Sequence, residues 1–168
     1  MKKAVIFDLD GTLIHLPIDY DGLFKEFSKI MKTKEVRPLT EKISRLKEDE
    51  RKRTFDVWDK FDLKALEHFT VNEEGMALYR KLSGSSKALV TMQGKALVKN
   101  ITERLDLSFD FTITREDSLD RVKQLQMATQ KLGTQSQSIL FIGNTEEDNL
   151  AARKVGCEFL RVRDESMV

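Results

Sequence analysis

Residues 4–12 read AVIFDLDGT, and the order of residue types in this stretch decides the fold. Four consecutive apolar residues, Ala4 to Phe7, are typical of a strand that is buried on both faces of a parallel sheet. The chain turns directly afterwards at Gly11. Asp8 and Asp10 therefore end a buried strand, where two carboxylates are unfavourable unless a cation or a substrate uses them. The stretch predicts a functional site at the carboxyl end of the first strand.

Four later segments repeat the apolar pattern and end in polar or turn residues; they are residues 88–91, 109–114, 139–142 and 158–162. Helical spacing of apolar residues lies between them, for example at Leu97, Ile101 and Leu105. Alternating strands and helices predict an α/β fold with a doubly wound parallel sheet. Because ligands of such sheets bind beyond the carboxyl ends of the strands, Thr91 and the turn at residues 143–144 should join Asp8 and Asp10 around one site.

Residues 15–81 interrupt this alternation with helical patterns alone. Apolar stripes predict three helices and a short fourth helix from residue 73 to residue 82, with Pro38 opening the second. The segment directly follows the proposed site, so we expect a helical cap over it. The predicted domains are a core of residues 1–14 and 82–168 and a cap of residues 15–81.

Charge and composition exclude several classes of function. Lys and Arg total 29 against 28 Asp and Glu, which gives no excess charge for binding nucleic acid or a membrane surface. The single cysteine, Cys157, cannot form a disulfide within the chain and fits a reducing compartment. We find no signal peptide or apolar span in the sequence, so we expect a cytoplasmic protein that acts on a small molecule, as a monomer or a homodimer.

Residues 7–13, FDLDGTL, resemble the first motif of the haloacid dehalogenase (HAD) superfamily phosphatases. The helical insertion after this motif is similar to the cap of the phosphoglycolate phosphatase and β-phosphoglucomutase branch. The resemblance implies a HAD-like, Rossmann-like core and Mg²⁺ as cofactor. It also implies that Asp8 is the nucleophile that forms an aspartyl-phosphate, and that Asp10 is the general acid and base and ligates the metal through its carbonyl.

The same resemblance implies further residues around the phosphate. Thr91 matches the hydroxyl motif of the family, although a threonine that caps a helix explains it equally well. Lys123 falls where the family places the lysine that neutralises the nucleophile, but Gln124 follows it where relatives often carry proline, and Lys131 is the alternative. The residues expected to bind the substrate phosphate are Gly11, Thr12, Thr91, Met92 and Lys123.

Residues 143–148, GNTEED, match the acidic motif of the family, with one departure. Asn144 stands where an aspartate is usual, so it offers Mg²⁺ an oxygen without a charge. Asp148 becomes the main acid of this motif. Thr145 and Asp148 also fit a helix capping box, and both roles can coexist.

The sequence leaves several functions open. The favoured one is a Mg²⁺-dependent phosphomonoester hydrolase, with phosphoglycolate as one substrate that the resemblance implies. The departure at Asn144 favours a second function, a binding protein with weak or silent catalysis. A haloacid dehalogenase would also carry Asn in the late motif, but Asp10 argues against it, and a sugar phosphomutase remains an alternative. His15 and His68 are expected to have ordinary polar or packing roles.

Overall fold

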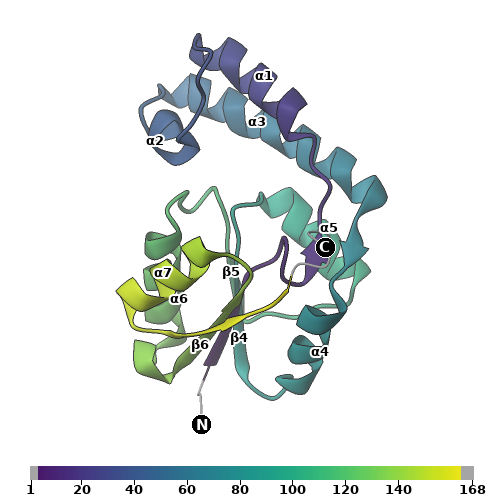
Figure 1. Cartoon of the computed structure of the whole chain (residues 1–168), viewed down its shortest axis with the longest axis vertical. Helices are drawn as coiled ribbons and strands as arrows, with labels where there is room; N and C mark the ends of the chain where they lie inside the picture. The colour runs from purple at the N-terminus through teal and green to yellow at the C-terminus, as the bar shows by residue number, and fades with distance from the viewer. Residues whose placement is uncertain (1–3, 164–168) are drawn as a thin grey trace.

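The computed structural model describes residues 4–163, and a five-stranded parallel sheet forms its centre (Figure 1). The strand order is β5 (Phe111–Ile113), β4 (Ser86–Val90), β1 (Ala4–Phe7), β6 (Ile139–Gly143) and β7 (Glu158–Arg161). The central strand is β1, which explains why its four residues are all apolar and all buried. The predicted α/β fold with a parallel sheet is confirmed.

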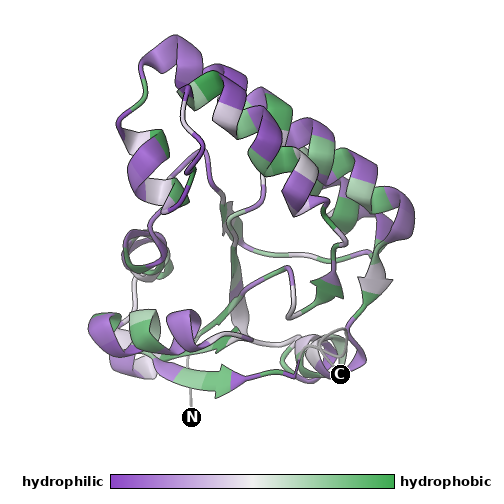
Figure 2. Cartoon of the chain, turned by 45° about the horizontal axis from the view of Figure 1, so that its top comes forward, coloured by the Kyte–Doolittle hydropathy of each residue, from purple (hydrophilic) through white to green (hydrophobic). Residues whose placement is uncertain are grey.

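Helices cover both faces of the sheet. Val5 and Phe7 of β1 pack on one face with Leu97 and Ile101 of α5 (Lys95–Arg104). The alternate residues of β1 pack on the other face with Leu125 of α6 (Arg121–Leu132) and with Ala151 and Ala152 of α7 (Glu146–Val155). In Figure 2 the strands are largely hydrophobic, whereas the helices mix hydrophilic and hydrophobic residues. The sheet therefore separates two apolar cores, as a doubly wound fold requires.

Three helices form a separate lobe above the carboxyl ends of the strands (Figure 1). They are α1 (Tyr20–Met31), α2 (Leu39–Ser44) and α3 (Glu48–Ala65), which is followed by the short helix η1 (Leu66–His68). The lobe has its own aromatic contact, because the ring centroids of Phe27 and Trp58 lie 5.5 Å apart. The lobe falls within residues 15–81, the range for which the sequence predicts a helical cap.

The fourth helix of the predicted cap belongs to the core. In α4 (Glu73–Lys81), the Tyr79 ring lies 5.9 Å from that of Phe7 of the central strand, and the Tyr79 hydroxyl accepts a hydrogen bond from Ser108 N. The predicted ranges, 15–81 for the cap and 82–168 for the second part of the core, are therefore corrected. The cap helices end at η1, because the apolar side of α4 packs on the sheet.

A two-stranded antiparallel ribbon, which the sequence did not predict, joins cap and core. It pairs β2 (Ile14–His15) with β3 (Thr70–Val71), so the chain enters and leaves the cap at adjacent points. Each strand has two residues, too few for any periodicity to reveal. A short helix η2 (Ser136–Ser138) completes the fold. Within residues 4–163, no helix combines the length and the apolar character that crossing a membrane requires.

Candidate active site

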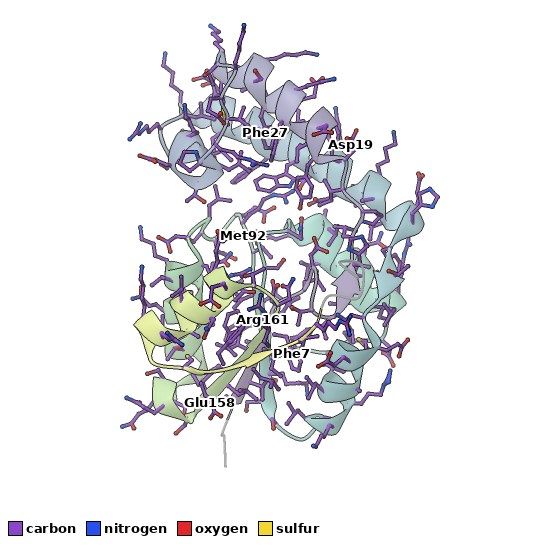
Figure 3. All side chains as sticks on the ribbon, viewed as in Figure 1. Phe7, Asp19, Phe27, Met92, Glu158 and Arg161 are labelled. Carbon is purple, nitrogen blue, oxygen red and sulfur yellow. The ribbon has the colours of Figure 1, made fainter. Side chains whose placement is uncertain are left out.

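A cavity of about 470 Å³ lies at the carboxyl ends of the strands, between the core and the cap. Figure 3 shows Met92, one of its lining residues, between the cap helices and the sheet. The cavity brings together most of the residues predicted from the sequence, namely Asp8, Asp10, Gly11, Thr91, Met92, Asn144 and Asp148. A larger cavity of about 740 Å³ lies between α1 and residues 34–37 of the cap, and it contains none of these residues.

The turn after β1 fixes the position of the two aspartates. Gly11 has a φ of +83°, and a Cβ atom there would lie 2.1 Å from Nδ2 of Asn144. Only glycine meets both requirements, a left-handed conformation and a close approach to a side chain. The turn is closed by hydrogen bonds from Gly11 N to Ile14 O and from Leu13 N to Leu9 O. The rigid turn presents Asp8 and Asp10 to the same cavity.

The Asp8 carboxyl is buried, with 5% of the residue exposed. Its Oδ1 accepts a hydrogen bond of 3.1 Å from Arg121 Nη2, and its Oδ2 accepts one of 3.3 Å from Thr12 Oγ1. Burial raises the pKa of Asp8 to about 7, with Arg121 opposing the rise and the neighbouring acid Asp148 adding to it. The pKa stays near neutral even with Arg121 in contact, so a further cation beside Asp8 would favour the ionised form that a nucleophile requires.

Arg121, at the first turn of α6, is the cation that contacts Asp8. It bridges two acids, since its Nε also lies 3.1 Å from Oδ1 of Asp148. The expectation that Lys123 would occupy this position is corrected, because the Lys123 side chain is exposed and lines a different cavity. Residues two apart on a helix point roughly 200° away from each other, so Arg121 and Lys123 cannot both face the site. The alternative, Lys131, lies 5.1 Å above the ring of Phe111 instead.

Gln124 holds Arg121 and the end of β4 together. Its Nε2 donates to the carbonyl oxygens of Thr91 at 2.9 Å and of Ser118 at 2.8 Å. Its Oε1 accepts a hydrogen bond of 2.9 Å from Nη1 of Arg121. The sequence showed Gln124 only as a departure from the family pattern. A fully buried glutamine at this point fixes the start of α6, and with it the direction of the guanidinium.

Asp148 completes the capping box of α7 and also lies at the cavity. Its Oδ2 accepts hydrogen bonds from Asn144 N and Thr145 N, and Thr145 Oγ1 accepts one from Asp148 N, which completes the capping box of α7. Its Oδ1 faces Arg121 in the cavity. One oxygen therefore fixes the helix, and the other remains directed at the site.

The oxygen atoms around Asp8 match the ligands that Mg²⁺ prefers. The cavity holds the carboxylates of Asp8, Asp10 and Asp148 and the side-chain amide of Asn144. Among residues 4–163 no group of three or more His, Cys, Asp or Glu side chains has the arrangement of a metal site. Two of these acids, Asp8 and Asp148, are buried around one shared guanidinium, which is an environment that a divalent cation would stabilise. The residues thus fit Mg²⁺ in chemistry, with one charge fewer because position 144 is asparagine.

Two of the hydroxyl groups predicted at the phosphate differ in what they can contact. Thr91 lines the cavity, and its Oγ1 accepts a hydrogen bond of 3.0 Å from Gln93 N, which leaves the hydroxyl hydrogen for donation. Thr12 is fully buried behind Asp8, where its hydroxyl contacts Asp8 and Asn144 and its N–H donates to Leu9 O. The expected phosphate contact of Thr12 is therefore corrected to a supporting contact.

The cap side of the cavity contains residues that the sequence did not single out as a site. They include Leu16, Tyr20 and Gln93, together with His15, for which only an ordinary role was expected. Leu16 N donates a hydrogen bond of 2.9 Å to Oδ1 of Asp10. The chain that leads into the cap thus orients the predicted general acid, a backbone contact that no sequence pattern reveals.

A second arginine joins the core to the cap next to the site. Arg115 follows β5 and is 0% exposed in its side chain; it donates to Asp62 of α3 at 2.8 Å and also to Asp59. Its guanidinium lies 4.4 Å from the centre of the Trp58 ring. Burial raises the pKa of Asp62 to about 6, with Arg115 opposing the rise. We call Arg115, Asp59, Asp62 and Trp58 the cap latch.

Comparison with known proteins supports this fold. No protein-family model matches the chain, and no curated protein matches it. Among solved structures, a HAD-superfamily hydrolase of subfamily IA from Geobacter sulfurreducens is 16% identical, with a TM-score of 0.66 over 96% of this chain and 89% of that one. A HAD family enzyme from Bacteroides thetaiotaomicron, a magnesium complex, is 16% identical with a TM-score of 0.61 over 98% and 94%. CbbY from Rhodobacter sphaeroides, in complex with phosphate, is 14% identical with a TM-score of 0.66 over 97% and 87%. The chain has the fold of HAD-superfamily hydrolases.

Proposed function

We propose that the protein is a Mg²⁺-dependent phosphomonoester hydrolase that acts on a small phosphorylated metabolite through an aspartyl-phosphate on Asp8. The observation that carries this proposal is the buried Asp8 carboxylate at the end of the central strand, facing a cavity and paired with Arg121. The HAD-like fold and the two neighbours solved with magnesium and with phosphate support it. A cytoplasmic location stays a prediction.

Each of the two half-reactions uses both aspartates. An oxygen of Asp8 attacks phosphorus, the bond from phosphorus to the ester oxygen breaks, and Asp10 gives its proton to the leaving alkoxide. Water then attacks phosphorus, Asp10 takes the proton from the water, and the bond from Asp8 to phosphorus breaks to release inorganic phosphate. The hydrogen bond from Leu16 N holds the Asp10 carboxyl in place for both transfers.

Charge stabilisation is assigned to residues around Asp8. Arg121 balances the charge of Asp8 and of the transferred phosphoryl group, and the Thr91 hydroxyl donates to a phosphoryl oxygen. Asp8, Asp10, Asn144 and Asp148 would hold Mg²⁺. When bound, Mg²⁺ supplies positive charge to the phosphoryl oxygens and lowers the repulsion between the phosphate and Asp8.

Asn144 favours one alternative function, a phosphate-binding protein that turns over slowly or not at all. It removes one negative charge from the expected metal ligands, which weakens Mg²⁺ binding. Asp10 argues against a dehalogenase, because a leaving halide needs no proton. A phosphomutase would use the same aspartates and differ only in which molecule accepts the phosphoryl group.

A Mg²⁺ titration with p-nitrophenyl phosphate tests the proposal against the binding protein. We expect phosphate release that requires Mg²⁺ and saturates at millimolar concentrations, about 1 to 10 mM, as is usual for weakly held Mg²⁺. Chemical trapping of the acyl phosphate should label Asp8. Phosphate binding without release at any Mg²⁺ concentration would instead support the binding protein.

A further inference from the structure

We propose that the active site selects phosphate esters of uncharged or cationic alcohols and rejects esters whose alcohol carries a carboxylate. This inference rests on the proposed function, since it concerns the leaving group of that reaction. It assigns a substrate class to the cap side of the cavity, which His15, Leu16, Tyr20, Met92 and Gln93 line.

The position of Asp10 shows where the alcohol part of a substrate lies. A general acid must contact the leaving oxygen, and the Asp10 carboxyl is tied to Leu16 N at the entry to the cap. Tyr20, the first residue of α1, follows Leu16 closely in the chain and lines the same cavity. A phosphate held at Asp8 therefore directs its alcohol towards Leu16 and Tyr20.

The charges that line the cavity are mostly negative. In the part of the chain that the structure describes, the lining includes the acids Asp8, Asp10, Glu147 and Asp148, and Arg121 is its only Lys or Arg. Arg121 already bridges Asp8 and Asp148. It is therefore committed to the phosphate end and cannot also receive a carboxylate on the alcohol.

The next arginine is also committed. Arg115 is fully buried, paired with Asp59 and Asp62, and packed against Trp58. Burial raises the pKa of the Tyr20 phenol; Asp10 and Asp62 add to the rise, while Arg115 opposes it. The region around Tyr20 is therefore one that disfavours negative charge, in spite of the nearby guanidinium.

A carboxylate placed beside Tyr20 would lie close to like charges, and among the described residues the lining offers it no Lys or Arg other than the already paired Arg121. An uncharged alcohol meets the phenol of Tyr20, which can donate or accept a hydrogen bond. An ammonium group meets an aromatic ring and the nearby acids, which attract it. The cap side thus discriminates by charge and not only by size.

Three esters with a two-carbon alcohol test this inference, because they differ mainly in charge: phosphoethanolamine, 2-hydroxyethyl phosphate and phosphoglycolate. We expect kcat/KM for phosphoglycolate to be about 10- to 100-fold below that for 2-hydroxyethyl phosphate. Phosphoethanolamine should match or exceed 2-hydroxyethyl phosphate. Equal or faster turnover of phosphoglycolate would overturn the inference.

A pair of variants removes the intrinsic reactivity of the esters from the comparison. Tyr20→Lys places a cation at the cap side, and Tyr20→Leu removes the phenol without adding charge. The ratio of kcat/KM for phosphoglycolate to that for 2-hydroxyethyl phosphate should rise about 10-fold or more in Tyr20→Lys relative to Tyr20→Leu. An unchanged ratio would show that the alcohol does not lie beside Tyr20, and would count against the proposal.

A binding measurement separates this inference from the proposed function. If no ester is hydrolysed, the proposed function fails, and calorimetric binding of the same esters to Asp8→Asn with Mg²⁺ decides the inference. Weaker binding of phosphoglycolate than of 2-hydroxyethyl phosphate would support charge selection even then. Equal binding, or no binding of either ester, would overturn it.

Discussion

Arg121 and Arg115 each join two aspartates, but they do so in different surroundings. Arg121 bridges Asp8 and Asp148 in the cavity with 16% of its side chain exposed, whereas Arg115 pairs with Asp59 and Asp62 with 0% exposed. Water and small ions can reach the Arg121 guanidinium but not that of Arg115, although Asp59 in the second cluster has 31% of its side chain exposed. Arg121, which lies in a cavity, can change partners when a phosphate enters. Arg115 is fully buried, and its movement away would leave Asp62 buried without a cation.

The Arg121 and Arg115 clusters are similar in composition, but we expect them to have different roles. In the Arg121 cluster, burial raises the pKa of Asp8 to about 7 even with the guanidinium in contact, so a divalent cation that entered the cavity would favour the ionised carboxylate. The Arg115 cluster carries its compensation inside the protein, because the guanidinium also stacks on Trp58. We therefore expect damage to the first cluster to affect activity, and damage to the second to affect folding.

The largest expected effect is that of Asp8→Asn. Removing the nucleophile should lower kcat by about 10⁴-fold or more and abolish the acyl phosphate, while the protein remains folded. Phosphate release and mass spectrometry of trapped protein measure this. Asp56→Asn, which removes the same charge from an exposed position on α3, should keep wild-type turnover. Substantial turnover by Asp8→Asn would overturn the assignment of the nucleophile.

Arg115→Met and Arg121→Met test whether the two clusters differ in their effects on stability and activity. Arg115→Met leaves Asp62 buried without its cation, so we expect the free energy of unfolding in urea to fall by about 3 kcal/mol or more. Arg121→Met should lose less stability in Mg²⁺, because cations reach Asp8 and Asp148 through the cavity, but should lower kcat by about 10² to 10³-fold. Similar losses of stability in the two variants would remove the distinction between the clusters.

The pH dependence of stability sharpens the description of the cap latch. Burial raises the pKa of Asp62 in the folded protein from 3.8 to about 6. Between these values the folded state holds a proton that the unfolded chain releases, so this group makes the free energy of unfolding fall as pH rises from about 4 to 6. We expect Asp62→Asn to remove about 1 to 3 kcal/mol of that fall, measured by urea unfolding without Mg²⁺. Asp56→Asn, on the same helix, is the matched control; the same pH dependence in wild type and Asp62→Asn would contradict the assignment.

Much of the site follows from local sequence, because strand ends carry it. An apolar run followed by aspartate and glycine predicts both β1 and the direction of Asp8, since parallel strands end at one edge of the sheet. Thr91 follows from the same rule, whereas Asp148, in the first turn of α7, was expected from the resemblance to the acidic motif of the family. The carboxyl end of a strand is a position that hydrophobic pattern alone can locate.

Arg121, Tyr20 and Arg115 could not be located in this way. At the start of α6 the family resemblance implied a lysine, which favoured Lys123. In the structure Arg121 lines the cavity, and Lys123, two residues further along the helix, points away from it. Tyr20 and Arg115 depend on how cap and core pack, which brings together residues 15–20, 59–62 and 115. Long-range packing of this kind leaves no local sequence pattern. A charged residue in a short loop after a strand, such as Arg115, is nevertheless a reason to look for a long-range ion pair.

The smallest expected effect is that of Asn144→Asp, which tests whether residue 144 sets the Mg²⁺ affinity of the Arg121 cluster. The variant adds a third acid beside Asp8 and Asp148, so calorimetry should show Mg²⁺ binding about 10-fold tighter than in the wild type. Asn149→Asp adds the same charge on α7 at a residue that does not line the cavity, and it should leave the affinity nearly unchanged. Equal tightening in both variants would reduce the effect to long-range attraction, and no tightening in Asn144→Asp would place residue 144 outside the metal ligands. Tighter binding in Asn144→Asp alone would mean that Asn144 keeps Mg²⁺ weakly bound, so that Mg²⁺ and Arg121 can alternate as the partner of Asp8 and Asp148. The Arg115 guanidinium, which is fully buried, cannot alternate with a cation in this way.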